Sequence, residues 1–246
     1  MRFWRREPAL GKNEKFLFIF PMLVWIGLLV SRPYVLQARC QYDPSVCDLK
    51  WVPKIDWPVI HYRDPVAERY SFIAQDTAAV VGVMVPIGVY TAFIIGQHLS
   101  PPLALAAFVR DGVLLAQTVA WNGAIMEYFR VGFQRPRPFV YSDPKDAGRN
   151  GAHYTSFYSG HTSFVATAMM AIFLLVVRRM PKSRILIAAF GVFGIAMTAM
   201  TGLFRVFNAR HFYTDVIFAS GMGGAIAIAI VWLHSRSNSD QAKSAQ

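Results

Sequence analysis

Six stretches of the chain are almost continuously hydrophobic, and shorter polar segments separate them. The hydrophobic stretches cover residues 16–30, 77–96, 103–126, 163–177, 185–202 and 214–233. A helix that crosses a membrane needs about 20 mostly apolar residues, and several of these stretches match that length. The sequence therefore predicts an all-α protein, a polytopic membrane helix bundle with six transmembrane helices, and it places residues 1–246 in a single membrane-embedded domain.

Two of the stretches have a second interpretation. The first, 16–30, is similar to the hydrophobic part of a signal peptide, but no clear small-x-small cleavage site precedes Arg32 and further hydrophobic stretches follow. We therefore interpret it as an uncleaved first span. The third is interrupted by Arg110 and Asp111. A charge inside a membrane is a functional hypothesis by default, but here we favour a snorkelling arginine or an ion pair between helices.

The composition supports a membrane protein over a soluble one. Hydrophobic residues make up 54% of the chain and charged residues only 16%, and the mean hydropathy is +0.34. Soluble domains usually carry about 25% charged residues, so six core helices of a soluble protein would lack the polar surface to cover them. The same composition excludes a disordered chain, a collagen and a disulfide-dense secreted scaffold.

The chain is strongly basic, with 25 Lys and Arg against 14 Asp and Glu and a formal net charge of +11. Such an excess is typical of proteins that bind nucleic acid, an anionic membrane surface or an anionic substrate. Because the sequence contains no nucleic-acid-binding motif, we expect no nucleic acid as a partner. The expected partners are the membrane bilayer and an anionic substrate.

The distribution of Lys and Arg among the loops predicts the orientation. These residues are denser in the N-terminal segment, the loop after the fourth stretch and the C-terminal tail than in the loops that would face the other side. Segments rich in Lys and Arg stay in the cytoplasm. We therefore expect a multi-pass protein of the plasma (inner) membrane with both termini in the cytoplasm. The loops after the third and fifth stretches then face the periplasm or exterior.

The longest segment outside the spans, 31–76, contains both cysteines of the chain, Cys40 and Cys47. The predicted orientation makes this segment an extracytoplasmic loop, where a disulfide can form and persist. The alternative is a pair of free thiols. A zinc site would need four ligands, and two cysteines without a nearby histidine or a second cysteine pair fall short of that number.

Unusual clusters of polar residues fall in two loops on the same predicted side. The first loop follows the third stretch, and the second precedes the sixth. Together they contribute Arg130, Arg137, Ser159, Gly160, His161, Arg205, His211 and Asp215. Alternation of the spans brings the two loops to one membrane face, so we expect these residues to lie within reach of one another. Two further arginines of the first loop, Arg135 and Arg149, are interpreted as anchors for lipid headgroups.

This set of residues suits phosphate chemistry. The planar fork of arginine matches phosphate oxygens, and several arginines with a hydroxyl and a backbone N–H can stabilise a phosphoryl transition state. Two histidines can divide nucleophilic and acid work. His211 and Asp215 are four residues apart and share one face of a helix. We expect the carboxylate to accept a hydrogen bond from one ring nitrogen and to leave the other free to attack.

At these positions the sequence resembles the type 2 phosphatidic acid phosphatase superfamily of membrane lipid phosphatases. The signature of that superfamily reads K-x6-R-P, then P-S-G-H, then S-R-x5-H-x3-D. The matching positions here are Arg130 for the lysine, Arg137-Pro138, Ser159-Gly160-His161, Arg205, His211 and Asp215. Tyr158 stands in place of the proline and Phe204 in place of the first serine of the third motif. None of these departures removes a nucleophile or a proton-transfer group.

The resemblance implies a role for each matching residue. His211 would attack the phosphorus and form a phosphohistidine, Asp215 would orient and stabilise that histidine, and His161 would protonate the leaving oxygen and then activate water. The phosphoryl oxygens would be held by Arg130, Arg137, Arg205, Ser159 and the amide of Gly160. No metal or other cofactor is expected, because the sequence has no H-E-x-x-H, no C-x-x-C and no carboxylate cluster of the kind that divalent ions bind.

The function predicted from these features is that of an integral-membrane lipid phosphatase with an outward-facing active site. Its substrate would be a lipid phosphate monoester or diphosphate: a phosphatidate-like lipid, phosphatidylglycerophosphate, a polyprenyl diphosphate or a lipid A phosphate. Alternatives are a lipid phosphotransferase that uses the same site and a non-enzymatic membrane transporter. Vanadium haloperoxidases have a similar active site, but they are soluble, which argues against them here. Neither the lipid nor the oligomeric state follows from the sequence.

Overall fold

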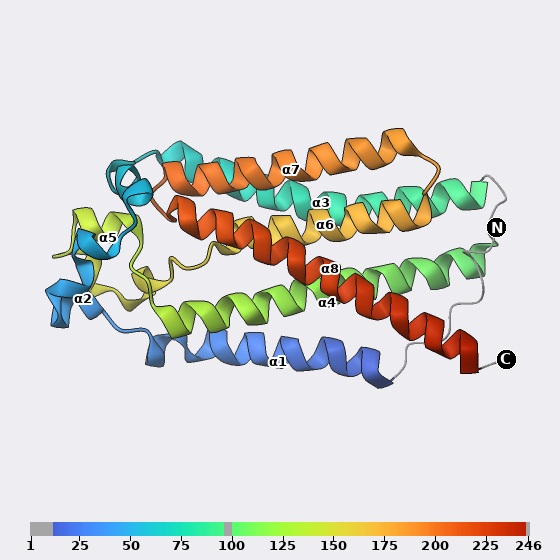
Figure 1. Cartoon of the computed structure of the whole chain (residues 1–246), viewed down its shortest axis with the longest axis horizontal. Helices are drawn as coiled ribbons and strands as arrows, with labels where there is room; N and C mark the ends of the chain where they lie inside the picture. Colours follow the sequence, from blue (N-terminus) through green and yellow to red (C-terminus); the bar gives the residue numbers. More distant parts are fainter. Residues whose placement is uncertain (1–11, 96–99, 245–246) are drawn as a thin grey trace.

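The structure, a computed structural model, describes residues 12–95 and 100–244, and within these ranges it is helical and contains no strand (Figure 1). The long helices of the bundle are α1 (Lys12–Val35), α3 (Pro65–Ile95), α4 (Pro101–Phe133), α6 (Gly160–Arg179), α7 (Arg184–Phe207) and α8 (Tyr213–Ser244). All six are long and apolar enough to cross a membrane. The predicted fold class, an all-α bundle with six membrane-crossing helices, is therefore confirmed.

Short helices gather at one end of the bundle, which we call the loop end (Figure 1). They are α2 (Arg39–Tyr42), α5 (Pro138–Ser142) and the 3-10 helices η2 (Pro44–Cys47), η3 (Leu49–Trp51), η4 (Lys54–His61), η5 (Ala147–Arg149) and η6 (Gly151–Tyr154). Cys40 and Cys47 are joined by a disulfide there, with their Cα atoms 5.7 Å apart. The start of α1 and the far part of α8 lie at the opposite end.

The helices extend beyond the hydrophobic stretches at several points. Most clearly, α3 begins at Pro65, so the last quarter of the segment predicted as a loop, 31–76, belongs to this helix. The backbone N–H groups of Val66 and Ala67 donate to Asp64 Oδ1 over 2.9 and 3.2 Å, which caps the first turn. A proline at the first helical position is equally favourable. The pattern of apolar residues does not predict this helix start, because it takes no account of capping residues such as Asp64 and Pro65.

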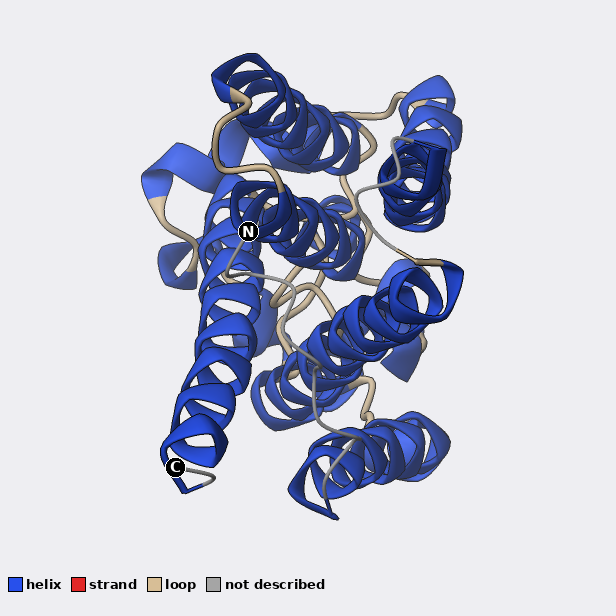
Figure 2. Ribbon diagram, turned by 90° about the vertical axis from the view of Figure 1, so that its right-hand side faces the viewer, coloured by secondary structure: helices blue, strands red, loops and turns tan. Residues whose placement is uncertain are grey.

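Helix α6 packs against four of the other long helices, α8, α7, α4 and α3. Figure 2 shows the bundle from one end. The contact of α6 with α8 is close at Gly223, where an added Cβ would lie 2.5 Å from the carbonyl oxygen of Ser163 and 2.9 Å from the Cβ of Ala166. Small residues at such points allow two membrane helices to approach each other. Because α6 begins at Gly160, this packing fixes the position of the Ser159–His161 motif at the loop end.

A charged pair lies inside the bundle toward the opposite end. Asp111 of α4 accepts from Arg179 Nη2 over 2.7 Å and from Arg179 Nε over 3.0 Å, and it also accepts from the hydroxyl of Tyr90. All three side chains are buried. Of the two interpretations given to this charged position, an ion pair between helices is therefore the one that the structure supports for Asp111.

Part of the long loop folds back onto the start of α8. Val59 and Ile60 of η4 form a buried hydrophobic cluster with Val206, Phe212 and Val216. The segment 36–64 is thus packed against the turn that precedes α8, and this contact brings η4 to the polar interior of the loop end.

Candidate active site

The turn between α7 and α8 carries His211 into the interior of the loop end. The ring is fully buried, and its Nδ1 lies 2.7 Å from the carbonyl oxygen of Ser156. Because a carbonyl oxygen can only accept, Nδ1 carries the hydrogen and Nε2 holds a lone pair, and Nε2 has no hydrogen-bond partner among the described residues. Burial and the positive charges of Arg205 and Arg137 lower the pKa of His211 well below its usual 6.5. The ring is therefore neutral at pH 7, the form in which a histidine is nucleophilic.

Asp215 is held by donors other than the ring of His211. Its Oδ2 accepts from the hydroxyl of Ser156 over 2.5 Å and from the backbone N–H of Phe212 over 2.9 Å, and its Oδ1 accepts from Arg135 Nη1 over 2.5 Å. The distance from Oδ2 to His211 Nδ1 is 3.9 Å. The expected bond from the ring to the carboxylate is therefore replaced by a bond from the ring to the Ser156 carbonyl.

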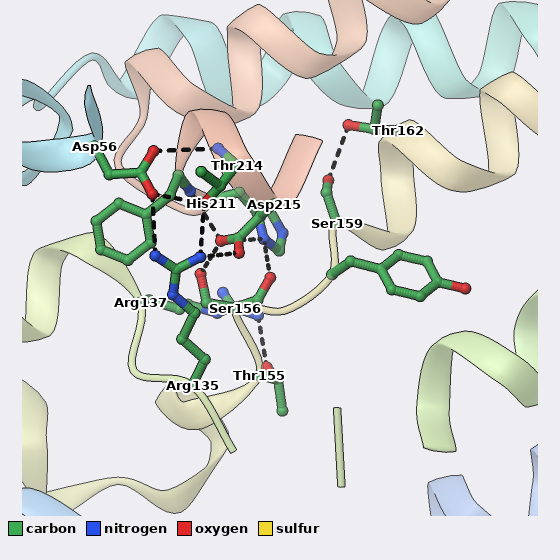
Figure 3. Close-up of polar contacts among 12 residues, drawn as sticks. Asp56, Arg135, Arg137, Thr155, Ser156, Ser159, Thr162, His211, Thr214 and Asp215 are labelled. Atoms are coloured by element: carbon green, nitrogen blue, oxygen red, sulfur yellow. Dashed lines mark hydrogen bonds and ion pairs between the residues drawn. The ribbon is translucent and has the colours of Figure 1, made fainter. Parts of the chain in front are cut away.

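The start of α8 explains this difference. Asp215 is the third residue of α8, and its carboxylate turns back to the N–H of Phe212, the residue before the helix. This geometry is that of a capping box, in which an acidic side chain satisfies a free N–H at the helix start. The carboxylate thus fixes the helix start and Ser156 at once, and Ser156 in turn orients the ring of His211 (Figure 3).

Two arginines bring unsatisfied donors to the same interior. Arg137, which precedes α5, donates from Nη2 to Thr155 over 3.1 Å, and Arg205, in the last turn of α7, donates from Nη1 to Ser71 over 3.3 Å. Their Nε atoms are buried and lack a hydrogen-bond partner within the described ranges. Buried donors of this kind are normally satisfied, so their presence in one place indicates a site that binds an acceptor.

Arg130 reaches the start of α6 from the last turns of α4. Its Nε donates to the carbonyl oxygen of Tyr158 over 3.2 Å. A Cβ added to Gly160 would lie 2.7 Å from Arg130 Nη2 and 2.7 Å from the sulfur of Met126. A side chain at position 160 would therefore displace the Arg130 guanidinium and the end of the Met126 side chain from the helix start.

The N-terminus of α6 completes the group. Ser159 occupies the N-cap position, with its hydroxyl 2.9 Å from that of Thr162, and the N–H groups of the first turn point out of the helix. Such a helix end favours an anion. His161, the second residue of α6, packs edge-on against Phe72 with ring centroids 4.6 Å apart. Its Nε2 is buried and, in the part of the chain that the structure describes, has no hydrogen-bond partner.

The structure thus places all eight residues singled out in the sequence at the loop end. They come from α4, the segment before α6, α6 itself, α7 and the start of α8. In the segment 12–95 and from 100 to 244, no group of three or more His, Cys, Asp or Glu side chains is arranged to hold a metal ion. The positive charge of the site is supplied by its arginines.

Sequence reasoning missed two groups of partners. Arg135, interpreted as a headgroup anchor, bridges Asp215 and Asp56 of η4, and Asp56 was not singled out at all. Glu127 of α4 binds Arg130 Nη1 over 3.3 Å and Arg32 of α1 over 2.5 Å. A weak signal existed for Glu127, which is three residues before Arg130 on the same helix. No spacing in the sequence connects position 56 with position 135.

Comparison with protein families gives a match to the model described as the PAP2 superfamily, over residues 111–239. These residues are more than half of the chain. The chain belongs to the PAP2 superfamily. All eight site residues fall inside the matched range, which confirms the resemblance read from the three motifs.

Among solved structures, this PAP2 chain is similar to the crystal structure of the first transmembrane PAP2 type phosphatidylglycerolphosphate phosphatase from Bacillus subtilis. The two share 14% sequence identity with a TM-score of 0.52, over 88% of this chain and 96% of that chain. At this identity the similarity concerns the fold. A search of curated proteins found no match. Membership of the superfamily and the apolar helices together make this chain an integral multi-pass membrane protein.

Proposed function

We propose that this PAP2 protein is a lipid phosphatase that hydrolyses a lipid phosphate monoester or diphosphate through a phosphohistidine intermediate. The observation that carries the proposal is the environment of His211. A neutral, fully buried ring directs the lone pair of Nε2 into an interior that also holds the buried Nε atoms of Arg137 and Arg205. A phosphoryl group placed there would meet a nucleophile and charge-assisted donors together.

The chemistry follows from the tautomer of His211. Nε2 attacks the phosphorus, the bond from phosphorus to the lipid oxygen breaks, and His161 donates a proton to that leaving oxygen. The Nδ1–H group stays bonded to the Ser156 carbonyl, and Asp215 stabilises the positive charge that the phosphorylated ring acquires. Water then attacks the phosphorus while His161 takes a proton from the water. Phosphate is released, and His211 returns to its original form.

The residues that hold the phosphoryl oxygens in this proposal are Arg130, Arg137, Arg205, Ser159 and the Gly160 amide. Arginine at position 130, where the superfamily pattern has lysine, is held by Glu127 and by the Tyr158 carbonyl, so that its Nη2 lies against Gly160. Three guanidinium groups neutralise the charge of a phosphate ester, and we therefore propose a reaction that needs no added metal.

A lipid is the proposed substrate because the site lies at the end of a bundle of membrane-crossing helices. The superfamily and the phosphatidylglycerolphosphate phosphatase to which the fold is similar support a lipid phosphate. We further propose that the loop end faces the exterior of a plasma membrane. The Cys40–Cys47 disulfide at that end is consistent with an oxidising side, where such bonds persist.

Phosphate release by the purified protein tests this function. We expect release from at least one of phosphatidate, phosphatidylglycerophosphate and undecaprenyl diphosphate in detergent micelles, with the same rate in EDTA. His211→Ala removes the nucleophile and should reduce turnover by about 10⁶-fold. The matched control is His153→Ala, since His153 binds the Ala147 carbonyl outside the site and should leave turnover unchanged.

The intermediate is tested by rapid quenching with a radiolabelled substrate. We expect label on the wild-type protein that is stable in base and lost in acid, as for a phosphoramidate, and no label on His211→Ala. Turnover by His211→Ala close to that of the wild type would contradict the mechanism. Absence of phosphate release from all three lipids would contradict the proposed function itself.

A further inference from the structure

Asp56 is a fully buried carboxylate in η4, outside residues 111–239 that match the family model. It accepts from the backbone N–H of Thr214 over 3.1 Å, from the hydroxyl of Thr214 over 2.5 Å and from Arg135 Nη2 over 3.1 Å. Thr214 is the second residue of α8, whose N–H has no partner inside its own helix. A residue of the long loop thus caps the helix that follows the proposed nucleophile.

Arg135 connects Asp56 with the proposed active site. One terminal nitrogen of its guanidinium binds Asp56, and the other binds Asp215 over 2.5 Å and Thr214 over 2.9 Å (Figure 3). The plane of the group lies over the ring of Phe212, with Cζ 4.2 Å from the ring centroid. The guanidinium is therefore held on three sides, and both carboxylates that it joins are fully buried.

The far end of this chain of contacts is the ring of His211. Asp215 binds the hydroxyl of Ser156, and the carbonyl of the same Ser156 accepts from Nδ1 of His211. A continuous series of polar contacts, buried except where it passes through the partly exposed Arg135, therefore runs from Asp56 through Arg135, Asp215 and Ser156 to His211 (Figure 3). Each contact in the series is 3.1 Å or shorter.

We propose that Asp56 and Arg135 are positioning residues for the reaction of His211, so that the loop 36–64 is a working part of the active site. This inference rests on the proposed function. Neither side chain reaches the phosphoryl group in this scheme. Asp56 fixes the direction of the Arg135 fork, and the fork fixes Asp215, which holds Ser156 and thereby the plane of the ring.

Charge explains why two carboxylates are needed. Arg135 alone would add a further cation to an interior that already contains Arg137 and Arg205. Asp56 and Asp215 compensate its charge, and the planar fork of arginine can bind both carboxylates at once. A lysine keeps the charge but has no such fork, so it cannot hold the two carboxylates in the same geometry.

The first variant is Asp56→Asn, which keeps the shape of the side chain and removes its charge. A displacement of about 1 Å at a reacting group can cost about 10²-fold in rate, so we expect kcat to fall about 10²-fold. KM and the inhibition constant of inorganic phosphate should stay unchanged, because the residues that hold phosphate are not altered. The matched control is Asp48→Asn in the same loop, where an exposed Asp48–Lys50 pair is broken and kcat should not change.

A second variant, Arg135→Lys, tests the contact between Asp56 and Arg135 from the arginine side. It keeps the positive charge at position 135, and it provides the test if Asp56→Asn does not fold. We again expect a fall in kcat of about 10²-fold with KM unchanged. In the double variant Asp56→Asn/Arg135→Lys, the loss should be no larger than in the stronger single variant, because residues that act through one contact are not additive. Asp56→Glu, which restores the charge on a longer side chain, should regain part of the activity.

The outcomes separate the two proposals. If the wild type releases phosphate and both single variants match Asp48→Asn, the positioning role is overturned and the proposed function stands. Losses that multiply in the double variant, or a loss of phosphate inhibition equal to the loss of kcat, overturn the positioning role as well. If the wild type releases no phosphate from any lipid of the panel, the proposed function fails and this inference fails with it.

Discussion

Two groups of buried charges at opposite ends of the bundle use the same residue types in different ways. Toward the opposite end, Arg179 and Asp111 form a two-pronged ion pair, and the hydroxyl of Tyr90 adds a further donor. At the loop end, neither Arg137 nor Arg205 has a carboxylate partner among the described residues, and their buried Nε atoms have no acceptor there. Loss of one partner from a satisfied buried pair destabilises a fold, whereas buried donors without acceptors are available to a ligand.

The carboxylates near the loop end follow the same division. Glu127, Asp56 and Asp215 are buried, and each is bound to an arginine: Glu127 to Arg130, and both aspartates to Arg135. They hold Arg130 and Arg135 in place, whereas no carboxylate among the described residues pairs with Arg137 or Arg205, two of the arginines that we propose to bind substrate. The difference between the two ends therefore lies in which arginines have a carboxylate, and not in how deeply the arginines are buried.

The largest expected effects come from substituting one arginine at each end of the bundle, which should affect activity at the loop end and stability at the opposite end. Arg205→Gln removes a donor to the phosphoryl oxygens, and we expect kcat to fall by about 10²–10³-fold with little change in melting temperature. Arg179→Gln leaves Asp111 buried without its cation, which should cost about 3–5 kcal/mol of unfolding free energy. The specific activity of the Arg179→Gln protein that remains folded should match the wild type.

Both variants are measured in the same detergent, by phosphate release and by thermal unfolding. The comparison would be wrong if Arg179→Gln lost as much specific activity as Arg205→Gln. It would be equally wrong if Arg205→Gln were the less stable of the two.

A pH series should sharpen the comparison by a smaller effect at the loop end. Because the folded pKa of His211 lies well below 6.5, the unfolded state binds more protons than the folded state in the window below 6.5. Above this window, a change of pH does not alter the unfolding free energy through His211. Inside the window, the unfolding free energy decreases as the pH is lowered, by up to about 1.4 kcal/mol per pH unit.

The measurement is the melting temperature of the wild type and of His211→Gln between neutral and mildly acidic pH. The variant cannot titrate at position 211, so the wild type should lose more stability than the variant as the pH falls. Parallel curves for the two proteins would show that the ring is not held in its neutral form by burial and the nearby arginines.

Orientation is tested by labelling and involves no expected change in activity or stability. Single cysteines at Asn150 and Ser183, in a background without Cys40 and Cys47, mark the loop end and the connection between α6 and α7. With a membrane-impermeant thiol reagent on intact cells, we expect labelling at Asn150 and none at Ser183. Permeabilised cells provide the control, since both positions should then react. Labelling confined to Ser183 in intact cells would place the chemistry on the cytoplasmic side.

Hydrophobic pattern and motif spacing anticipated most of the architecture and the eight site residues. They did so because membrane spans need long apolar runs and because the three motifs keep fixed spacings in one chain. Helix limits were less well anticipated. The start of α3 at Pro65 depends on the cap provided by Asp64, which hydrophobicity does not register.

The contacts around His211 show what a pattern cannot give. A spacing of four residues predicted a direct bond between His211 and Asp215, and the two groups do lie 3.9 Å apart. The carboxylate instead caps its own helix, because a free N–H at a helix start is a nearer donor than the ring. The ring donates to Ser156, which lies 55 residues away in the chain.

By itself, the sequence determined that the chain is a six-helix membrane protein, and it singled out the residues that we propose to carry phosphate chemistry. These properties depend on local composition and short spacings, which can be read along one dimension. Only the tertiary structure decided that Asp56 and Arg135 join the site, that Glu127 holds Arg130, and which arginines keep free donors. Such pairings depend on how loops fold over the end of the bundle, where charges far apart in the chain are buried together and must find partners.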